Sequence, residues 1–315
     1  GVVTHLRLWN TTASELQTHQ DDAYFKMVNK IAESLYPDDS NEEGKKLRLQ
    51  QQYLLSATGV QTAIKEQLDL GRDIKDLHKY YTFQINDTHP TLVIPELMRI
   101  LMDIFHLGYD ESWDITTKTV AFTNHTILQE ALEKWDIKIF QTLLPRIYEI
   151  IQEMNRRFKR ELEAKGLSKE EIYPMQLIGN NNLRMANICI FGSFSVNGVA
   201  ALHTEILKAE TFNNFYKLYP EKFNNKTNGV THRRWLFHIN QELVSLLDKT
   251  IGKAWHKDLN KLEDLLEFKD DKKVQKLVKD MKHAKKVQLA ERIKKLEGIE
   301  IDPNSIFDIQ VKRLH

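Results

Sequence analysis

Phe-Gln-Ile-Asn-Asp-Thr-His-Pro, at residues 83–90, joins an apolar stretch to a run of short polar side chains. Residues 80–85 are rich in aromatic and β-branched side chains, which predicts a strand. Pro90 favours the first turn of a helix, which we expect to begin at His89 and to run to about residue 105. A strand, a polar loop and a helix in this order are typical of an α/β fold.

Two later runs have the same character: Thr-Asn-His-Thr at 123–126 and Asn-Lys-Thr-Asn-Gly at 225–229. Each follows an apolar stretch, and residues 119–122 predict a second strand. Hydroxyl, amide and imidazole groups make many directional hydrogen bonds. Open α/β sheets place such groups at the carboxyl ends of their strands. The pattern therefore predicts a pocket for a ligand rich in hydroxyl groups, such as a sugar.

Hydrophobic periodicity and turn signals predict the remaining elements. They are a strand at 6–9, a helix at 21–36, an acidic loop at 37–44, helices through 46–79, a helix carrying Glu130 and Glu133, a long helix at 137–165, a loop from 192 that leads into a helix ending near 207, a helix over about 233–247, helices with a solvated face over 256–297 and a strand at 307–312. This order predicts a helix-rich α/β chain.

The composition is that of an ordinary globular protein of 315 residues, with 41% hydrophobic side chains. Lys and Arg number 45 and Asp and Glu 44, so the net charge of +1 gives no reason to expect nucleic acid or a membrane as partner. The single cysteine, Cys189, excludes an internal disulfide and lies in an apolar run, which predicts an inert core thiol. A reducing cytoplasm is the natural setting.

Several further motifs have a recognisable order. They include Leu-Arg-Leu-Trp at 6–9, Gly-Lys-Lys-Leu-Arg-Leu at 44–49, Ile-Pro-Glu-Leu-Met-Arg-Ile-Leu at 94–101, Met-Ala-Asn-Ile-Cys-Ile at 185–190, Val-Asn-Gly-Val-Ala at 196–200 and Ile-Gln-Val-Lys-Arg-Leu-His at 309–315. Together with the three polar runs, they make the chain resemble the α-glucan phosphorylases, the family of glycogen, starch and maltodextrin phosphorylase. The likeness covers nearly the whole chain and thins over about 156–180 and 251–300.

The resemblance implies a GT-B-like architecture of two domains, of which this chain is a middle portion. Residues 1–225 then belong to the C-terminal part of a glucan-binding domain, and residues 226–315 begin a domain for cofactor and phosphate. The start at Gly1 rather than Met fits a piece of a longer protein. The family's cofactor lysine lies beyond His315, so the isolated chain is expected to be inactive.

The resemblance also implies a reaction. In this family, phosphate attacks the nonreducing end of an α-1,4-glucan and releases glucose 1-phosphate with retention. Pyridoxal 5'-phosphate takes part through its phosphate group, and no metal is expected. The parent protein is expected to be a cytoplasmic homodimer.

Site residues carry over by their place in the matching motifs. The resemblance assigns catalytic roles to His125, Asn228 and Arg313, glucan contacts to Asp39, Ser40, Arg48, Asp87, His89, Glu130, Ala131 and Glu133, and cofactor contacts to Trp235 and Lys312. The residues alone leave simpler roles open. Asp87 could be a helix N-cap, His125 a structural histidine, and Asn228 part of an Asn-Gly turn. Trp235 could equally be a core side chain.

Two other function classes remain open at this level. A glycoside hydrolase could use Asp87 or Glu133. Glu130 and Glu133, three residues apart on an expected helix, could suggest its acid and base, although these groups face each other across a bond in such enzymes. The chain could also be a non-catalytic glucan-binding or structural piece. Asn41 and Glu42 stand where the regulated animal enzymes carry aromatic residues, which brings this loop closer to the bacterial maltodextrin type.

Overall fold

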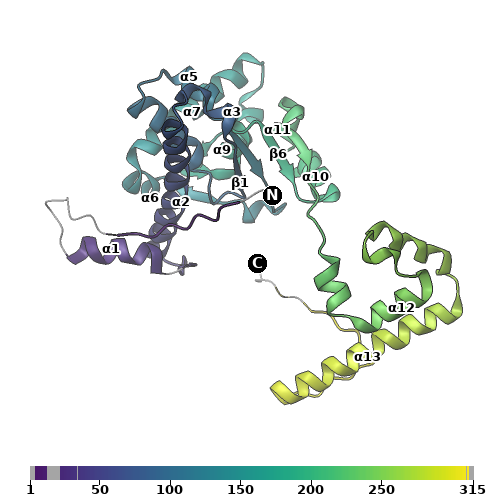
Figure 1. Cartoon of the computed structure of the whole chain (residues 1–315). Helices are drawn as coiled ribbons and strands as arrows, with labels where there is room; N and C mark the ends of the chain where they lie inside the picture. The colour runs from purple at the N-terminus through teal and green to yellow at the C-terminus, as the bar shows by residue number, and fades with distance from the viewer. Residues whose placement is uncertain (1–3, 13–21, 34, 310, 312–315) are drawn as a thin grey trace. The chain divides into compact units, whose positions relative to one another are not determined.

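A computed structural model describes residues 4–12, 22–33, 35–309 and 311. The chain divides into two compact units, Gly1–Asn228 and Gly229–His315 (Figure 1).

A four-stranded parallel sheet forms the centre of the first unit. Its strands are β1 (Phe83–Asn86), β2 (Val120–Thr123), β6 (Ser195–Gly198) and β7 (Phe223–Asn225), in the order β1-β2-β6-β7. The register aligns Ile85, Phe122, Val196 and Phe223 in one row across the sheet, and all four side chains are buried. This apolar row fixes the register because a shift by one residue would expose it.

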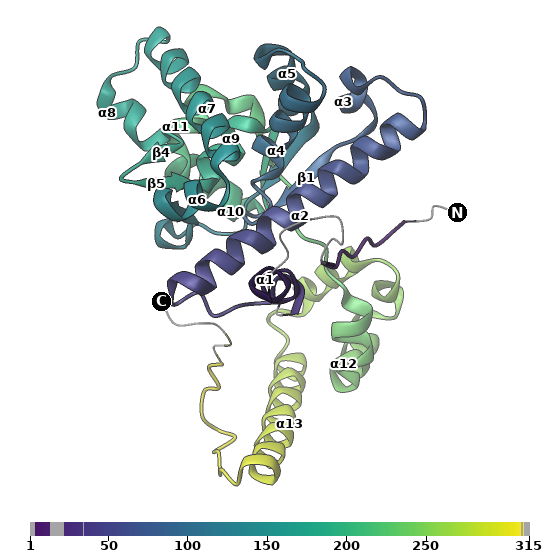
Figure 2. The same cartoon turned by 90° about the vertical axis from the view of Figure 1, so that its left-hand side faces the viewer.

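The helices of this unit pack on the sheet or on one another, and some are interrupted by 3₁₀ or π-helical segments, marked η (Figure 2). In chain order they are α1 (Asp22–Glu33), α2 (Glu42–Asp69), η1 (Ile74–Asp76), α3 (Leu77–Tyr80), α4 (Val93–Arg99), η2 (Ile100–Ile104), α5 (Tyr109–Thr119), η3 (Gln129–Ala131), α6 (Ile137–Leu143), α7 (Pro145–Ala164), α8 (Lys169–Ile172), η4 (Tyr173–Met175), α9 (Met185–Gly192), α10 (Ala201–Ile206), η5 (Leu207–Thr211), α11 (Asn213–Leu218) and η6 (Pro220–Lys222).

The innermost helix is α9, because every one of its side chains is buried. It packs closely on α4: a Cβ added to Gly192 would lie 2.8 Å from the side chain of Ile94. Cys189 lies in this helix and is fully buried, as the sequence predicted, and burial raises the pKa of its thiol. A small antiparallel sheet of β3 (Lys134–Asp136), β5 (Asn182–Arg184) and β4 (Ile178–Gly179) completes the unit.

The second unit is helical in its described part. It contains η7 (Arg233–His238), α12 (Gln241–Ile251), η8 (Ala254–His256), η9 (Leu259–Phe268) and α13 (Lys272–Glu297). Its core holds the fully buried Trp255, whose Nε1 donates to Asp248 at 3.1 Å.

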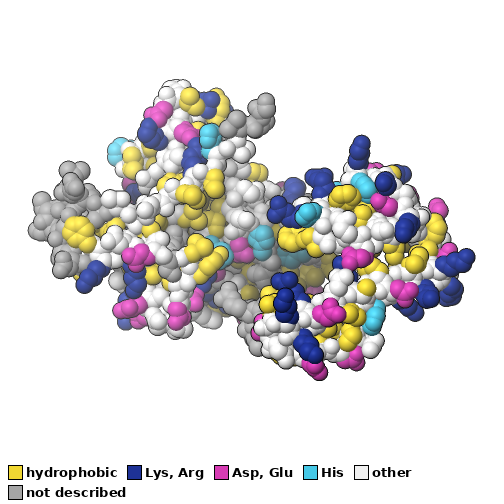
Figure 3. Space-filling model, turned by 60° about the horizontal axis from the view of Figure 1, so that its bottom comes forward, with side chains coloured by type: hydrophobic (Ala, Val, Ile, Leu, Met, Phe, Trp, Pro, Cys, Tyr) yellow, Lys and Arg dark blue, Asp and Glu magenta, His cyan; other side chains and the backbone are white. Residues whose placement is uncertain are grey.

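Charges of both signs are mixed on the surface of the chain. On the face shown in Figure 3, Lys and Arg side chains are scattered with Asp and Glu between them, in keeping with the near-zero net charge of the whole chain.

Several predicted elements are confirmed by the structure. The strand predicted at 80–85 appears as β1, at 83–86, and the strand predicted at 119–122 appears as β2, at 120–123. The helical stretch at 46–79 corresponds to α2, η1 and α3. These segments carry long periodic patterns or dense β-branched and aromatic side chains, so local sequence was sufficient.

Other predictions are wrong at the chain's two ends. Residues 4–12 form no regular element, and Leu6 and Leu8 are 86% and 83% exposed. The strand predicted at 307–312 is also absent at 307–309 and 311, while 310 and 312 lie outside the described residues. In both places an alternating pattern without a neighbouring strand gives no sheet, because a strand needs a hydrogen-bonding partner.

Further predictions are wrong within the units. The helix predicted at 137–165 is split before Pro145, which has no N–H to donate and starts α7 instead. The helix expected from 89 begins only at Val93, after a turn, and the acidic loop ends earlier because α2 begins at Glu42. The stretch from 192 contains β6 before its helix, and the stretch over 233–247 is divided into η7 and α12.

In the part of the chain that the structure describes, no helix is both long enough and apolar enough to cross a membrane.

Candidate functional site

Polar side chains gather where the four parallel strands end. One residue beyond the buried apolar row, the register aligns Asn86, Thr123, Asn197 and Asn224. We call this row and the loops that follow it the carboxyl edge. Parallel strands bring their carboxyl ends to the same side of a sheet, which is where open α/β sheets bind ligands.

The loops of the carboxyl edge are tied to each other beyond the strands. The N–H of Asp87 donates to the carbonyl of Thr123 at 2.8 Å, and that of Asn124 donates to Asn197 at 2.9 Å. The N–H of Asn228 donates in the same way to the carbonyl of Val199 at 2.9 Å. The backbone of each of these loops is thus tied to the neighbouring strand or to the loop that follows it.

Asp87 has an unusual backbone conformation, with φ of +63°. Asp is one of the few residues other than Gly that tolerate this left-handed region. Its Oδ1 accepts from the N–H of Thr88 at 2.6 Å. Asp87 is not the N-cap of α4, because that helix begins six residues later, at Val93, and its N-cap is Leu92. The N-cap reading is therefore wrong, and the half-buried carboxylate belongs to the carboxyl edge.

His125 follows β2, and its side chain is exposed at the carboxyl edge. Its Nε2 forms a short hydrogen bond with Oδ1 of Asn86. The neighbouring Asn124 is fully buried and accepts from the N–H of Thr126 at 3.1 Å, while its Nδ2 has no partner among the described residues. The exposed His125 ring is thus held at Nε2 by Asn86.

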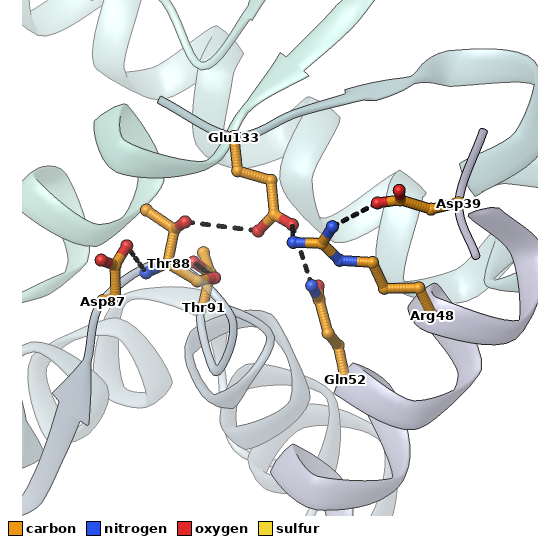
Figure 4. A network of polar contacts seen from close by, with 7 residues as sticks. All are labelled: Asp39, Arg48, Gln52, Asp87, Thr88, Thr91 and Glu133. Atoms are coloured by element: carbon orange, nitrogen blue, oxygen red, sulfur yellow. Dashed lines mark hydrogen bonds and ion pairs between the residues drawn. The ribbon is translucent and has the colours of Figure 1, made fainter. Parts of the chain in front are cut away.

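Glu133 is the centre of a polar network that joins distant parts of the first unit (Figure 4). Its Oε1 accepts from Arg48 at 3.1 Å and from Gln52 at 2.9 Å, and its Oε2 accepts from Thr88 at 3.3 Å. Only 12% of the Glu133 side chain is exposed. Three donors around this largely buried carboxylate fix its direction.

The network continues into the acidic loop. Arg48, on α2, also binds the carboxylate of Asp39. The loop is ordered locally, because Asp38 accepts from the N–H of Ser40 at 3.0 Å, a bond that lowers the pKa of Asp38. Asn41 caps α2 by accepting from the N–H of Gly44 at 2.9 Å.

Glu130 and Glu133 do not share a helix, which corrects the sequence prediction. Glu130 lies in the short η3 segment with Ala131, and both residues are exposed. Glu133 lies beyond η3, directly before β3. The chain becomes extended there because Lys134–Asp136 pairs with β5.

The remaining predicted site residues are distributed unevenly. His89 and Asn228 are exposed in the loops after β1 and β7. Trp235 lies in the second unit, on η7, with 69% of its surface exposed, so it is not a core residue. Lys312 and Arg313 lie outside the described residues. The structure therefore brings together Asp87, His125 and Asn228 at the carboxyl edge, and Asp39, Arg48 and Glu133 in the polar network.

Sequence reasoning missed two members of the network, Gln52 and Thr88. Gln52 lies four residues after Arg48 on one helix, so the two side chains share a face. That spacing could have identified Gln52. Thr88 adjoins Asp87 in the first polar run, but nothing in the sequence pairs it with Glu133.

The described residues do not by themselves form a pyridoxal phosphate site. The one described residue assigned to the cofactor, Trp235, presents an open ring surface and no phosphate-holding group. Among the described residues, no group of three or more His, Cys, Asp or Glu side chains is placed to hold a metal ion.

Chemically, the arrangement is suited to binding hydroxyl groups. Asn, Asp, His and Thr side chains offer donors and acceptors on several adjacent loops. A hydrolase would need a carboxylic acid and a carboxylate on opposite sides of a glycosidic bond. Glu133 instead already accepts from three protein donors.

Comparison with known proteins agrees with this description. A family model described as carbohydrate phosphorylase matches residues 1–315. Glycogen phosphorylase of Bacillus subtilis (strain 168) is 42% identical over 100% of this chain and 40% of its own length. Maltodextrin phosphorylase of Streptococcus pneumoniae is 46% identical over 89% of this chain and 36% of its own length. The muscle form of glycogen phosphorylase from Homo sapiens is 40% identical over 100% of this chain and 40% of its own length.

The chain thus spans about two-fifths of the length of these relatives. The family model covers the chain from end to end, and the alignments with the two bacterial relatives cover 100% and 89% of it. The chain belongs to the carbohydrate phosphorylase family.

Proposed function

We propose that the full-length protein is an α-1,4-glucan phosphorylase. It transfers the nonreducing-end glucose of an α-glucan to phosphate and releases glucose 1-phosphate with retention. The observation that carries this proposal is the carboxyl edge, where Asp87, His125 and Asn228 follow β1, β2 and β7. The loop of Asp87 is bonded directly to the end of β2, and the loops of His125 and Asn228 are each bonded to β6 or the residue after it. The names of the relatives, which are glycogen and maltodextrin phosphorylases, support the same reaction.

In this proposal the first unit binds the sugar. His125 and Asn228 contact the glucosyl unit that is transferred, and the ring of His125 is open for such a contact. The glucan chain is bordered by a larger set of residues, namely Asp39, Ser40, Arg48, Asp87, His89, Glu130, Ala131 and Glu133. Glu133 acts chiefly by keeping Arg48 and Thr88 in position, because its oxygens are already occupied by them and by Gln52.

The phosphate half of the site is assigned to Arg313 and Lys312. A guanidinium provides a charged fork that matches phosphate oxygens. Pyridoxal phosphate is the proposed cofactor, and its phosphate group supplies a proton donor and acceptor when bound. Trp235 is proposed to lie beside its ring. The division near residues 225–226, between a glucan-binding and a cofactor domain, and a cytoplasmic homodimer are parts of the same proposal.

The test is the phosphate dependence of glucan breakdown by the full-length protein. With maltoheptaose, phosphate and pyridoxal phosphate, we expect glucose 1-phosphate and little free glucose. Without phosphate, breakdown should stop. Release of glucose or maltose in phosphate-free buffer would identify a hydrolase instead. Glucan binding without either product would indicate a non-catalytic protein.

The isolated segment 1–315 is expected to be inactive in the same assay. This expectation belongs to the same proposal, because the resemblance assigns residues of the sugar half to this segment but not the cofactor lysine. Its ability to bind maltoheptaose can be measured separately by calorimetry.

A further inference from the structure

His203 lies on α10, directly behind the loop that follows β6. Its Nδ1 accepts from the backbone N–H of Val199 at 3.0 Å. Val199 is the first residue after β6 and therefore belongs to the carboxyl edge. An imidazole can accept at Nδ1 only when the proton of the neutral ring is on Nε2, so this contact selects one tautomer.

Val199 also contacts the next loop of the carboxyl edge, through its carbonyl group. The carbonyl of Val199 accepts from the N–H of Asn228 at 2.9 Å. The adjacent helix residue, Thr204, forms a hydrogen bond from Oγ1 to Asn225 Oδ1 at 2.9 Å. Two consecutive side chains of α10 are therefore connected to β7 and the loop after it. Thr204 bonds the last residue of β7, and His203 reaches Asn228 through Val199.

The other side of the imidazole faces the loop after β2. Its Nε2 is buried, lacks a well-formed hydrogen bond within the described residues, and lies toward the backbone carbonyl of Thr126. His125 is the titratable neighbour whose charge acts on it. His203 thus lies between the loop that carries His125 and the loop that leads to Asn228.

Little space separates His203 from the strand. A Cβ added to Gly198 would lie 2.8 Å from Nδ1 of His203 and 2.5 Å from Oγ1 of Thr204. The close approach of α10 to β6 depends on the missing side chain at this position. A substitution at Gly198 would therefore displace His203 from the strand side.

We propose that His203 is a positioning residue for the sugar half of the site, because its neutral imidazole fixes Val199 and, through Val199, the backbone of Asn228. The proposal rests on the proposed function and adds a residue to it. His203 touches no reacting atom in this role. It acts by fixing the loop whose side chain does.

The role requires the unprotonated ring. Protonation of Nδ1 would place an N–H against the N–H of Val199 and break the contact. Burial lowers the pKa of His203, and the nearby His125 lowers it further, whereas the carbonyl of Thr126 opposes the shift. The ring should therefore stay neutral to a lower pH than a free histidine, and the contact should be lost on the acid side of that point.

The experiment uses three variants of the full-length protein. His203→Leu removes both nitrogens at similar size. His203→Asn keeps a polar acceptor close to the position of Nδ1. His78→Leu is the matched control, since His78 is another partly buried histidine of the first unit but its Nδ1 has no partner among the described residues.

We expect His203→Leu to lower kcat about tenfold, in keeping with the loss of one hydrogen bond. His203→Asn should recover most of this loss, and His78→Leu should leave kcat unchanged. The parent should lose kcat on the acid side as His203 is protonated, and His203→Asn should lack that component. If His203→Leu has the same kcat and the same pH profile as the parent, the proposal is overturned, whatever the change in melting temperature.

Hydrogen exchange gives a readout that does not depend on activity. The N–H groups of Val199 and Asn228 should exchange faster in His203→Leu and at the parent rate in His203→Asn. If exchange responds in this way but no glucose 1-phosphate forms in any variant, the proposed function fails and the positioning role stands. Gly198→Ala provides a second perturbation of the same contact if His203→Leu does not fold. Unchanged exchange at both N–H groups in these variants would overturn the role.

Discussion

Arg48 and Glu133 are 85 residues apart in the sequence and are joined by an ion pair of 3.1 Å. The same guanidinium binds Asp39, so one side chain of α2 connects the acidic loop to the segment between η3 and β3. Glu133 in turn accepts from Thr88, which follows Asp87 at the carboxyl edge. The position of the acidic loop and the position of the edge are therefore coupled through Arg48.

Replacing Arg48 by Ala should weaken use of the glucan in the full-length protein. The change removes the cation that pairs with the largely buried Glu133 and leaves it the neutral donors Gln52 and Thr88, at a cost of about 1–3 kcal/mol. We expect kcat/KM for maltoheptaose to fall about tenfold or more. Lys46→Ala is the control, since Lys46 makes an exposed pair with Glu42 on the same helix. Equal effects of the two changes would contradict the proposed coupling.

Replacing His125 by Ala should lower kcat/KM strongly with little effect on the fold. The exposed ring contributes little packing, while loss of a polar partner to a bound hydroxyl costs about 1–3 kcal/mol. The expected fall is about tenfold to a hundredfold, measured as glucose 1-phosphate release. His283→Ala, on an exposed position of α13, should have no effect. Activity of His125→Ala close to that of the parent would leave His125 with a structural role only.

Arg99 should be essential for the stability of the first unit. It binds the fully buried Glu96 through two hydrogen bonds of 2.8 Å, and Tyr53 donates to the same carboxylate at 3.0 Å. Arg99→Met would leave a buried charge without its cation, at a cost of about 3 kcal/mol. We expect a clear fall in the urea midpoint. Arg99→Met combined with Glu96→Met should recover much of it, because no buried charge then remains.

The exposed pair of Arg146 with Asp103 provides the comparison for that prediction. Arg146 is half exposed, so Arg146→Met should cost less than about 1 kcal/mol. A loss at Arg146 as large as that at Arg99 would show that burial of Glu96 is not the cause.

Lys222 should make the stability of the first unit depend on alkaline pH. Its Nζ donates to the carbonyls of Ile190 and Phe191 at the end of α9, at 3.1 Å each. Burial lowers the pKa of Lys222 to about 8. The pKa of an unfolded lysine is about 10.4. Between the folded and the unfolded pKa of Lys222, the unfolded chain therefore binds more protons than the folded one. The free energy of unfolding should therefore rise with pH through this window, by at most about 3 kcal/mol.

Lys222→Met should remove this rise. The measurement is the free energy of unfolding of parent and variant at a series of pH values between neutral and alkaline. Tyrosines such as Tyr53, whose pKa is raised to about 12 mainly by burial, contribute equally to both proteins and cancel in the difference. Lys217→Met, at an exposed position of α11, is the control. The same pH slope in parent and Lys222→Met would contradict the assignment.

The sequence by itself determined the elements with strong local patterns. β1 and β2 could be predicted because aromatic and β-branched side chains favour extended chain wherever it pairs. The polar runs after them predicted where a ligand would bind. The family could also be identified, because its motifs occur in order over most of the chain, and the matching family model confirms it.

The tertiary structure alone decided the elements whose state depends on a distant partner. Ser195–Gly198 is short and half polar, and it is a strand because β2 pairs with it on one side and β7 on the other. Glu133 is separated from Glu130 because the chain after it pairs with β5. His203 shows the same limit: its bond to Val199 is local, but its connection to Asn228 depends on β6 and β7 lying side by side. Such hydrogen bonds form between segments that only folding brings together, so no local pattern encodes them.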